Sequence, residues 1–150
     1  METDETVTRY LGVDLGTRRI GVALSDELGL TAQALPTLEP RTEDDAVDAI
    51  RALIDRYGVG EVVVGLPKNM NGTLGPAAEK ALAFARRLEE GGDAKVTLWD
   101  ERLTSRAAER LLIEADVRRA KRRRALDQMA AVLILQGFLD RSRVQKDRPS

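Results

Sequence analysis

Hydrophobic and polar positions follow one another along this chain in a way that predicts short strands separated by helices. Runs of alternating or continuous apolar residues, rich in Val, Ile and Leu, are bounded by Gly, Pro and polar turns. A tight turn at Gly16-Thr17 joins the first two runs. Five segments are predicted to be strands or extended: 8–15, 19–25, 30–38, 61–66 and 95–99.

Apolar residues at helical spacing predict helices between and after these strands. The first follows a capping box at Thr42 and ends at Gly58, and the second has Pro76 at its first position. A third is expected to begin near Thr104, and a final, mostly apolar helix covers about 125–139.

The order of these elements predicts an α/β fold. The first three strands are close enough in sequence to form an antiparallel meander, and the later strand–helix–strand crossovers imply parallel pairing. We therefore expect a mixed sheet with helices on both faces. The 150 residues are expected to form a single domain with a core over about 9–140, and residues 141–150 are expected to be a frayed polar tail.

The composition excludes several kinds of catalysis. The chain has no His and no Cys, so it contains no Ser-His-Asp triad, no thiolate nucleophile and no His- or Cys-ligated metal. Sites built from carboxylates suit hard cations, here Mg²⁺ or Mn²⁺. The absence of Cys, of a signal peptide and of a membrane-spanning run favours a cytoplasmic protein with no membrane partner.

Charge is distributed unevenly along the chain. The formal net charge is −1, but residues 1–61 hold 13 acidic and 6 basic residues, whereas residues 62–150 hold 12 acidic and 18 basic ones. Six of the seven residues from Arg118 to Arg124 are cations. Such a cluster is either a solvated face or a site that binds the phosphates of a nucleic acid.

Three acidic residues are placed where carboxylates are costly unless they are paired or bind a metal. Asp14 ends an apolar strand and shares one side of the pleat with Gly12 and Gly16, where the missing side chains are expected to leave space for a ligand. Glu101 follows the fifth strand, and Asp127 lies near the start of the final helix. These three residues could converge on one or two Mg²⁺ ions that cleave a phosphodiester.

Each acid also has a structural interpretation. Asp14 could cap its turn, Glu101 could pair with Arg102 or Arg106, and Asp127 could stabilise the positive end of its helix.

Polar and basic residues near these acids are candidates for nucleic-acid binding. The loop over 68–73 is either a simple turn or a phosphate contact made by Lys68 and backbone N–H groups. The candidates are Thr17, Arg18, Arg19, Lys68, Asn69, Arg102, Arg118, Arg119, Lys121, Arg122, Arg123 and Arg124.

Four motifs in order resemble the YqgF family of bacterial pre-16S rRNA nucleases, also called Holliday-junction-resolvase-like proteins. They read GVDLGTRRIGVALSD, VVVGLPKNMNGTLGPAAE, WDERLTS and RRRALDQMAAVLILQGFLD, and they cover roughly residues 9–140. The resemblance implies an RNase H-like fold, with a five-stranded mixed sheet flanked by helices. It also implies a metal-dependent nuclease whose acids match Asp14, Glu101 and Asp127. Before its last motif the family often has Lys and Ser, whereas this chain is dense in Arg.

The resemblance leaves the substrate open. The leading interpretation is processing of the 5′ end of pre-16S ribosomal RNA, with Asp14 bridging the metals and water as the nucleophile. The alternative is a Holliday junction resolvase, a DNA endonuclease that needs two active sites, whereas we expect a monomer or a weak homodimer. Two other interpretations are a nucleotide-binding domain like that of sugar kinases, which needs a second domain, and a non-catalytic RNA-binding protein, which would not bind divalent metal.

Overall fold

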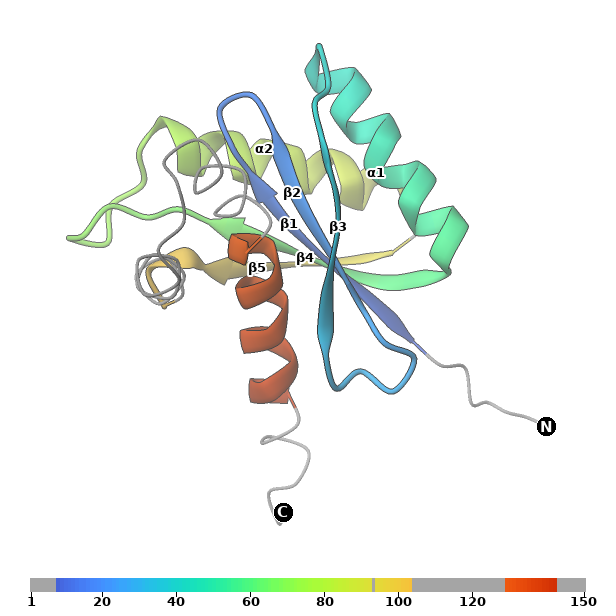
Figure 1. The fold of residues 1–150 in the computed structure, drawn as a ribbon. Helices are drawn as coiled ribbons and strands as arrows, with labels where there is room; N and C mark the ends of the chain where they lie inside the picture. Colours follow the sequence, from blue (N-terminus) through green and yellow to red (C-terminus); the bar gives the residue numbers. More distant parts are fainter. Residues whose placement is uncertain (1–7, 93, 104–128, 143–150) are drawn as a thin grey trace, which may run out of the picture.

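A computed structural model describes residues 8–92, 94–103 and 129–142. Its five strands form one sheet with the order β3-β2-β1-β4-β5, and Figure 1 shows helices on both sides of it. The elements are β1 (Arg9–Leu15), β2 (Ile20–Ser25), β3 (Ala32–Leu38), α1 (Glu43–Tyr57), β4 (Val59–Leu66), α2 (Pro76–Gly91), β5 (Lys95–Asp100), the short 3₁₀ turn η1 (Glu101–Leu103) and a helix over 129–142.

The predicted mixed sheet is confirmed. β1, β2 and β3 pair antiparallel as a meander, and β4 pairs parallel with both β1 and β5. Pro36 lies inside β3, which an edge strand tolerates because one side of its backbone has no ladder partner.

Local signals in the sequence set the ends of the helices. The side chain of Thr42 accepts a hydrogen bond from the backbone N–H of Asp45 at 3.0 Å and so caps α1. Gly58 ends α1 in the left-handed conformation, and β4 follows at once, two residues earlier than the apolar run predicts. Pro76 is the first residue of α2, as predicted. The final helix extends to residue 142, three residues past its predicted end at 139.

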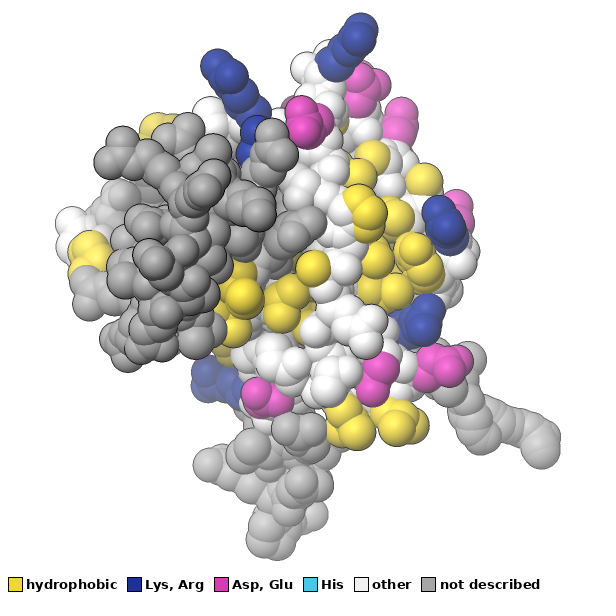
Figure 2. Space-filling model, in the orientation of Figure 1, with side chains coloured by type: hydrophobic (Ala, Val, Ile, Leu, Met, Phe, Trp, Pro, Cys, Tyr) yellow, Lys and Arg dark blue, Asp and Glu magenta, His cyan; other side chains and the backbone are white. Residues whose placement is uncertain are grey.

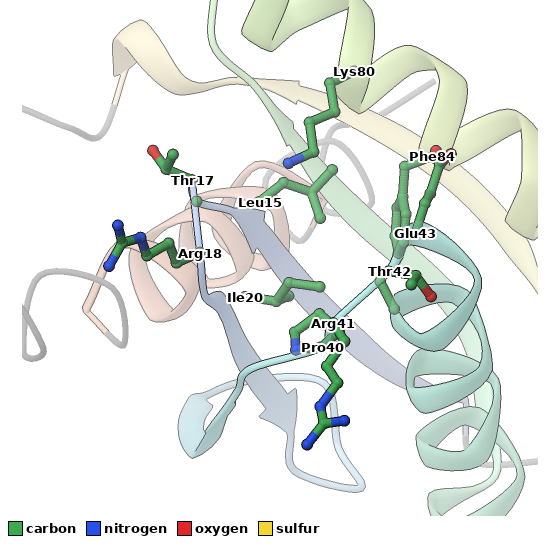
Figure 3. A pocket seen from close by; sticks show the side chains of 12 residues that line it. Leu15, Thr17, Arg18, Ile20, Pro40, Arg41, Thr42, Glu43, Lys80 and Phe84 are labelled. Atoms are coloured by element: carbon green, nitrogen blue, oxygen red, sulfur yellow. The ribbon is translucent and has the colours of Figure 1, made fainter.

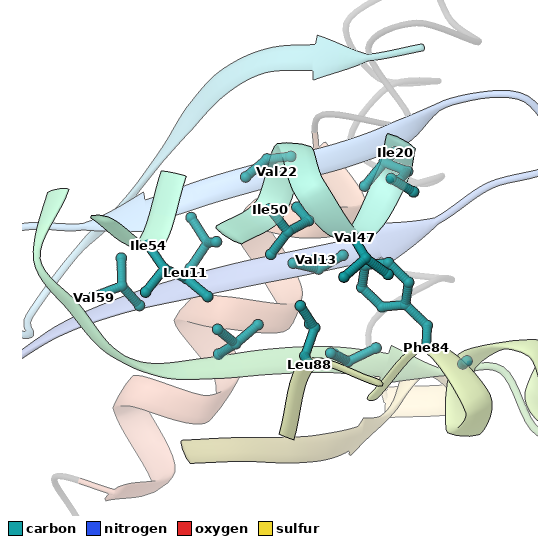
Figure 4. Packing of buried hydrophobic residues seen from close by; sticks show 14 of the residues in the cluster. Leu11, Val13, Ile20, Val22, Val47, Ile50, Ile54, Val59, Phe84 and Leu88 are labelled. Carbon is teal, nitrogen blue, oxygen red and sulfur yellow. The ribbon is translucent and has the colours of Figure 1, made fainter. Parts of the chain in front are cut away.

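Two apolar clusters hold the helices against the sheet. The larger one lies under α1 and α2, where Leu11 and Val13 of β1 contact Val47 and Ile50 of α1 and Phe84 of α2 (Figure 4). All five side chains are at most 2% exposed, so this layer excludes water.

The smaller cluster lies on the opposite face, under helix 129–142, and includes Ala131, Ile134 and Leu135. Gln136 fixes this helix to the start of β3, because its side chain accepts from the N–H of Ala32 at 2.9 Å and donates to the carbonyl of Leu30 at 2.8 Å. The described part of the chain has no helix of the length and apolar character needed to cross a membrane.

The expected open space beside Gly12 is filled. A Cβ atom at this position would lie 2.8 Å from Leu135 Cβ and 3.0 Å from the Ala131 carbonyl oxygen. Gly12 therefore permits close packing of helix 129–142 on β1, and the prediction that it leaves room for a ligand is wrong. The missing side chain serves a helix–sheet contact instead.

Candidate active site

Asp14 and Glu101 come together at the carboxyl ends of parallel strands. Asp14 is the sixth residue of β1, and Glu101 directly follows β5. The two side chains form a hydrogen bond with each other although 87 positions separate them in the sequence. In open α/β sheets, ligands bind preferentially at this edge.

Gly65 makes this contact possible. β4 lies between β1 and β5, so the Glu101 side chain must cross the end of β4 to reach Asp14. A Cβ atom at Gly65 would lie 2.6 Å from Glu101 Oε2 and 2.7 Å from Ile134 Cδ1. Gly65 is not among the candidates predicted from the sequence, although a glycine at the end of a run of valines is a signal of close approach.

The carboxyl pair has unusual electrostatics. Burial raises the pKa of Glu101 to about 8, and the neighbouring charge and hydrogen bond of Asp14 act in the same direction. Two carboxylates this close repel each other when both are ionised, so their contact favours a proton on Glu101. The pairing of Glu101 with Arg102 that the sequence left open is wrong, because Arg102 turns to Asp100 instead.

The donor set fits a divalent cation. Carboxylate oxygens are the ligands that Mg²⁺ and Mn²⁺ prefer, and the cation would replace the proton that the pair otherwise shares. Within residues 8–92, 94–103 and 129–142 no group of three potential metal ligands occurs. Asp127, the expected third acid, lies outside the described residues, as does Arg106.

Asp100 and Arg102 form an ion pair next to the acid pair. The guanidinium Nη2 of Arg102 lies 2.8 Å from Asp100 Oδ2, and its Nε lies 3.1 Å from both carboxylate oxygens. This contact lowers the pKa of Asp100, which therefore stays ionised beside a protonated Glu101. Arg102 Nη1 also lies 3.5 Å from the carbonyl oxygen of Met70, in the loop after β4.

The loop over 68–74 is closed by its own hydrogen bonds. The N–H of Asn69 donates to the carbonyl of Thr73, and that of Gly72 donates to the carbonyl of Asn69. The N–H of Thr73 donates to the Asn71 side chain. These three N–H groups are therefore used within the turn. Lys68 is half-buried and Asn69 is exposed. Contact of this loop with a phosphate would therefore be made by these side chains rather than by the three N–H groups.

Three of the remaining candidates, Thr17, Arg18 and Arg19, lie in the turn between β1 and β2. Thr17 and Arg18 are exposed on the β1–β2 turn, which the N–H of Gly16 closes by donating to the carbonyl of Arg19 at 2.8 Å. Figure 2 shows Lys and Arg side chains over this turn and over the segment between β3 and α1. The other six basic candidates form the run over 118–124, which lies outside the described residues.

Known proteins resemble this chain over nearly its whole length. Residues 8–141 match the model of the RuvX family, described as Holliday junction resolvase. A protein of Geobacillus kaustophilus, named provisionally as a pre-16S rRNA nuclease, is 58% identical over 137 residues, 90% of this chain and 99% of the relative. A Bacillus cereus protein (strain B4264) with the same name is 55% identical over 135 residues, 89% of this chain and 98% of the relative.

Solved structures share the fold at low sequence identity. RuvC of T. thermophilus in complex with a Holliday junction has a TM-score of 0.54 at 17% identity and covers 90% of this chain and 96% of its own. The fowlpox virus Holliday junction resolvase has a TM-score of 0.53 at 16% identity and covers 89% of this chain and 99% of its own. These likenesses, together with the five-stranded sheet, confirm the predicted RNase H-like fold.

Proposed function

Because the chain belongs to the RuvX family, which is the YqgF family of the sequence resemblance, we propose that it is a divalent-metal-dependent nuclease that processes the 5′ end of pre-16S ribosomal RNA. Relatives at 55–58% identity, whose names refer to that activity, support the substrate. A cytoplasmic site of action, expected from the composition, belongs to the same proposal.

The observation that carries the proposal is the contact between Asp14 and Glu101. Two carboxyl groups from segments far apart in the sequence meet where Gly65 leaves room for Glu101, and the raised pKa of Glu101 means that its ionised form is disfavoured without a bound cation. Active sites are where such costs are maintained, because the same like-charge pair binds a cation strongly.

The chain's own residues have distinct roles in this proposal. Asp14 and Glu101 would hold Mg²⁺ or Mn²⁺, with Asp127 as the expected third ligand. The bound metal would supply Lewis acidity at the phosphate and lower the pKa of a water molecule, the nucleophile. Glu101 must release its proton to serve as a ligand. Asp100 remains ionised and holds Arg102 at the edge of the site, where the guanidinium can orient a phosphate.

The first test is cleavage of labelled precursor rRNA by an Asp14→Asn variant with Mg²⁺ present. We expect the rate to fall by at least about 10²–10³-fold, as for the loss of one directly acting electrostatic group. Asp55→Asn is the matched control, because Asp55 is exposed on α1, far along the chain from the site. Circular dichroism should show both variants folded. Undiminished cleavage by pure Asp14→Asn protein would refute the proposal.

Resolution of Holliday junctions is the second candidate, and the description of the matching family favours it. The same proteins should therefore be assayed on a four-way DNA junction in parallel with the rRNA. Symmetric, Asp14-dependent cutting of the junction without cutting of the RNA would reverse the order of the two candidates.

A further inference from the structure

A cavity of about 340 Å³ lies beside the end of β1, on the face of the sheet opposite to the acid pair. The β1–β2 turn, the segment that leads into α1, and α2 surround it (Figure 3). Its volume is within the range of small-molecule sites, which starts at about 300 Å³. Two nucleic-acid-binding candidates, Thr17 and Arg18, line this cavity, but the proposed metal site does not use it.

Three cationic side chains line the cavity. Lys80 extends from α2 toward the turn, whereas the guanidinium groups of Arg18, on the turn, and of Arg41, next to Pro40, point outward at the rim of the cavity (Figure 3). All three are exposed, and no carboxylate of the described residues lies within 4 Å of them. The one acid in the lining, Glu43, is 3.5 Å from Arg87 Nη1 and is partly neutralised. The cavity therefore offers net positive charge to a ligand.

The N-terminus of α1 adds little to this charge. Thr42 already accepts the hydrogen bond of Asp45, and Glu43, Asp44 and Asp45 all lie in the first turn. Attraction for an anion would come from the three side chains.

The floor of the cavity is apolar. Leu15, Ile20, Ala46 and Phe84 line it, and the last three are at most 6% exposed. An inorganic anion alone would gain nothing from such a floor. A ligand with a flat, weakly polar body and an attached anionic group would match both parts, and a nucleotide combines a base with a phosphate in this way.

The cavity is also close in sequence to Asp14, one of the proposed metal ligands. Leu15 lines the cavity, and its neighbour Asp14 points to the other face of the sheet, because side chains alternate along a strand. The exposed turn residues Thr17 and Arg18 line the cavity and follow Asp14 by three and four positions. A single strand that crosses this turn could contact both sites at once.

We propose that this cavity binds one unpaired nucleotide of the RNA substrate, with its base against the apolar floor and neighbouring phosphates at Lys80 and Arg41. The inference rests on the proposed function for the identity of the RNA, and it adds a subsite that selects single-stranded RNA beside the cleaved bond.

Photo-crosslinking tests the proposal without requiring catalysis. Asp14→Asn protein is irradiated with single-stranded precursor rRNA in Mg²⁺, and crosslinked peptides are identified by mass spectrometry. Crosslinks are expected in Pro40–Ala46 or Lys80–Phe84. The double variant Arg41→Glu/Lys80→Glu should lose them, bind the RNA about tenfold less tightly, and show a log–log salt slope shallower by about 1.4, or 0.7 for each phosphate contact on a single strand.

Arg86→Glu is the matched control, because Arg86 is exposed on the same helix as Lys80 but does not line the cavity. Equal losses of affinity in Arg86→Glu and in the double variant would overturn the inference, as would RNA crosslinks that avoid both segments. Adenosine monophosphate provides a second arm: occupation of the cavity by the free nucleotide, with no RNA crosslink there, would also overturn it.

The two proposals can fail separately. Crosslinks in the cavity without any cleavage by the wild-type protein would refute the nuclease and leave the nucleotide site standing. Cleavage that is unaffected by Arg41→Glu/Lys80→Glu would refute the nucleotide site and leave the nuclease standing.

Discussion

Gly65 shows how one missing side chain can make room for a carboxyl group that we propose to be catalytic. Glu101 reaches Asp14 only because no Cβ atom occupies the end of β4, where it would lie 2.6 Å from Glu101 Oε2. The two atoms nearest to such a Cβ are at the ends of flexible side chains, those of Glu101 and Ile134. These side chains can move aside without disturbing the fold, but the movement of Glu101 would change the geometry of the acid pair.

We therefore predict that Gly65→Ala lowers the cleavage rate far more than stability. A shift of about 1 Å in a catalytic group can cost on the order of 10²-fold in rate. The unfolding free energy should change by no more than about 1–3 kcal/mol, the range for an overpacked site. Gly60→Ala, in the same strand but next to the Thr8 side chain, is the control and should retain activity. Equal rates for the two variants would contradict the positioning role of Gly65.

The raised pKa of Glu101 makes the stability of the metal-free protein depend on pH. The pKa is 4.5 ordinarily and about 8 in the fold, so the folded state binds the extra proton between these values. Stability from this group is fully present below pH 4.5 and is lost as the pH rises through 8. Because the chain contains no His or Cys, no other side chain ordinarily titrates between pH 5.5 and 8.

Urea unfolding in the presence of a chelator should therefore show stability falling from pH 5.5 to 8.5, with a slope of at most about 1.4 kcal/mol per pH unit. Glu101→Gln should flatten this dependence, since glutamine has no proton to lose. Mg²⁺ added at pH 8.5 should restore stability to the wild-type protein but not to the variant. A wild-type profile that is flat, or that rises with pH, would contradict the shared proton.

At the scale of elements, the packing of helix 129–142 depends on Gly12. A Cβ atom there would meet Leu135 Cβ and the Ala131 backbone carbonyl, and neither atom can move unless the whole helix moves. The contacts of Gln136 with Leu30 and Ala32 hold the helix at a second point. The helix therefore cannot simply slide away from the sheet.

We predict that Gly12→Ala destabilises the protein by about 1–3 kcal/mol, the cost of overpacking a core that cannot relax. Urea unfolding against the wild type measures the difference, and Gly60→Ala controls for the change from Gly to Ala within a strand. If Gly12→Ala were as stable as Gly60→Ala, the helix would have to be free to shift.

At the scale of the whole molecule, oligomeric state separates the two candidate functions. Resolution of a four-way junction requires two coordinated cuts and hence two active sites, whereas trimming one RNA end requires a single site. We predict that the protein is mainly monomeric, as measured by sedimentation velocity, at the concentration at which it cleaves precursor rRNA. A stable dimer that cuts junctions symmetrically would favour the resolvase instead.

The sequence by itself determined the five strands, the first two helices and the chemistry that they can carry, whereas the helix predicted to begin near Thr104 lies outside the described residues. Thr42, Gly58 and Pro76 act on the backbone within a few residues of themselves, so the ends of α1 and the start of α2 could be predicted. The absence of His and Cys restricted the site to carboxylates, and the placement of Asp14 and Glu101 at strand ends identified two of them. The prediction of Asp127 as the third acid remains to be tested.

Only the tertiary structure decided what lies next to what. Gly12 and Gly65 look alike as glycines in apolar strands, yet Gly12 admits a helix and Gly65 admits the Glu101 carboxyl group. Arg102 pairs with Asp100 rather than Glu101, and Arg41 and Lys80 meet around a cavity that neither local pattern predicts. Hydrophobic periodicity and capping act over a few residues, whereas these contacts join segments tens of residues apart, which become neighbours only when the strands pair and the helices pack.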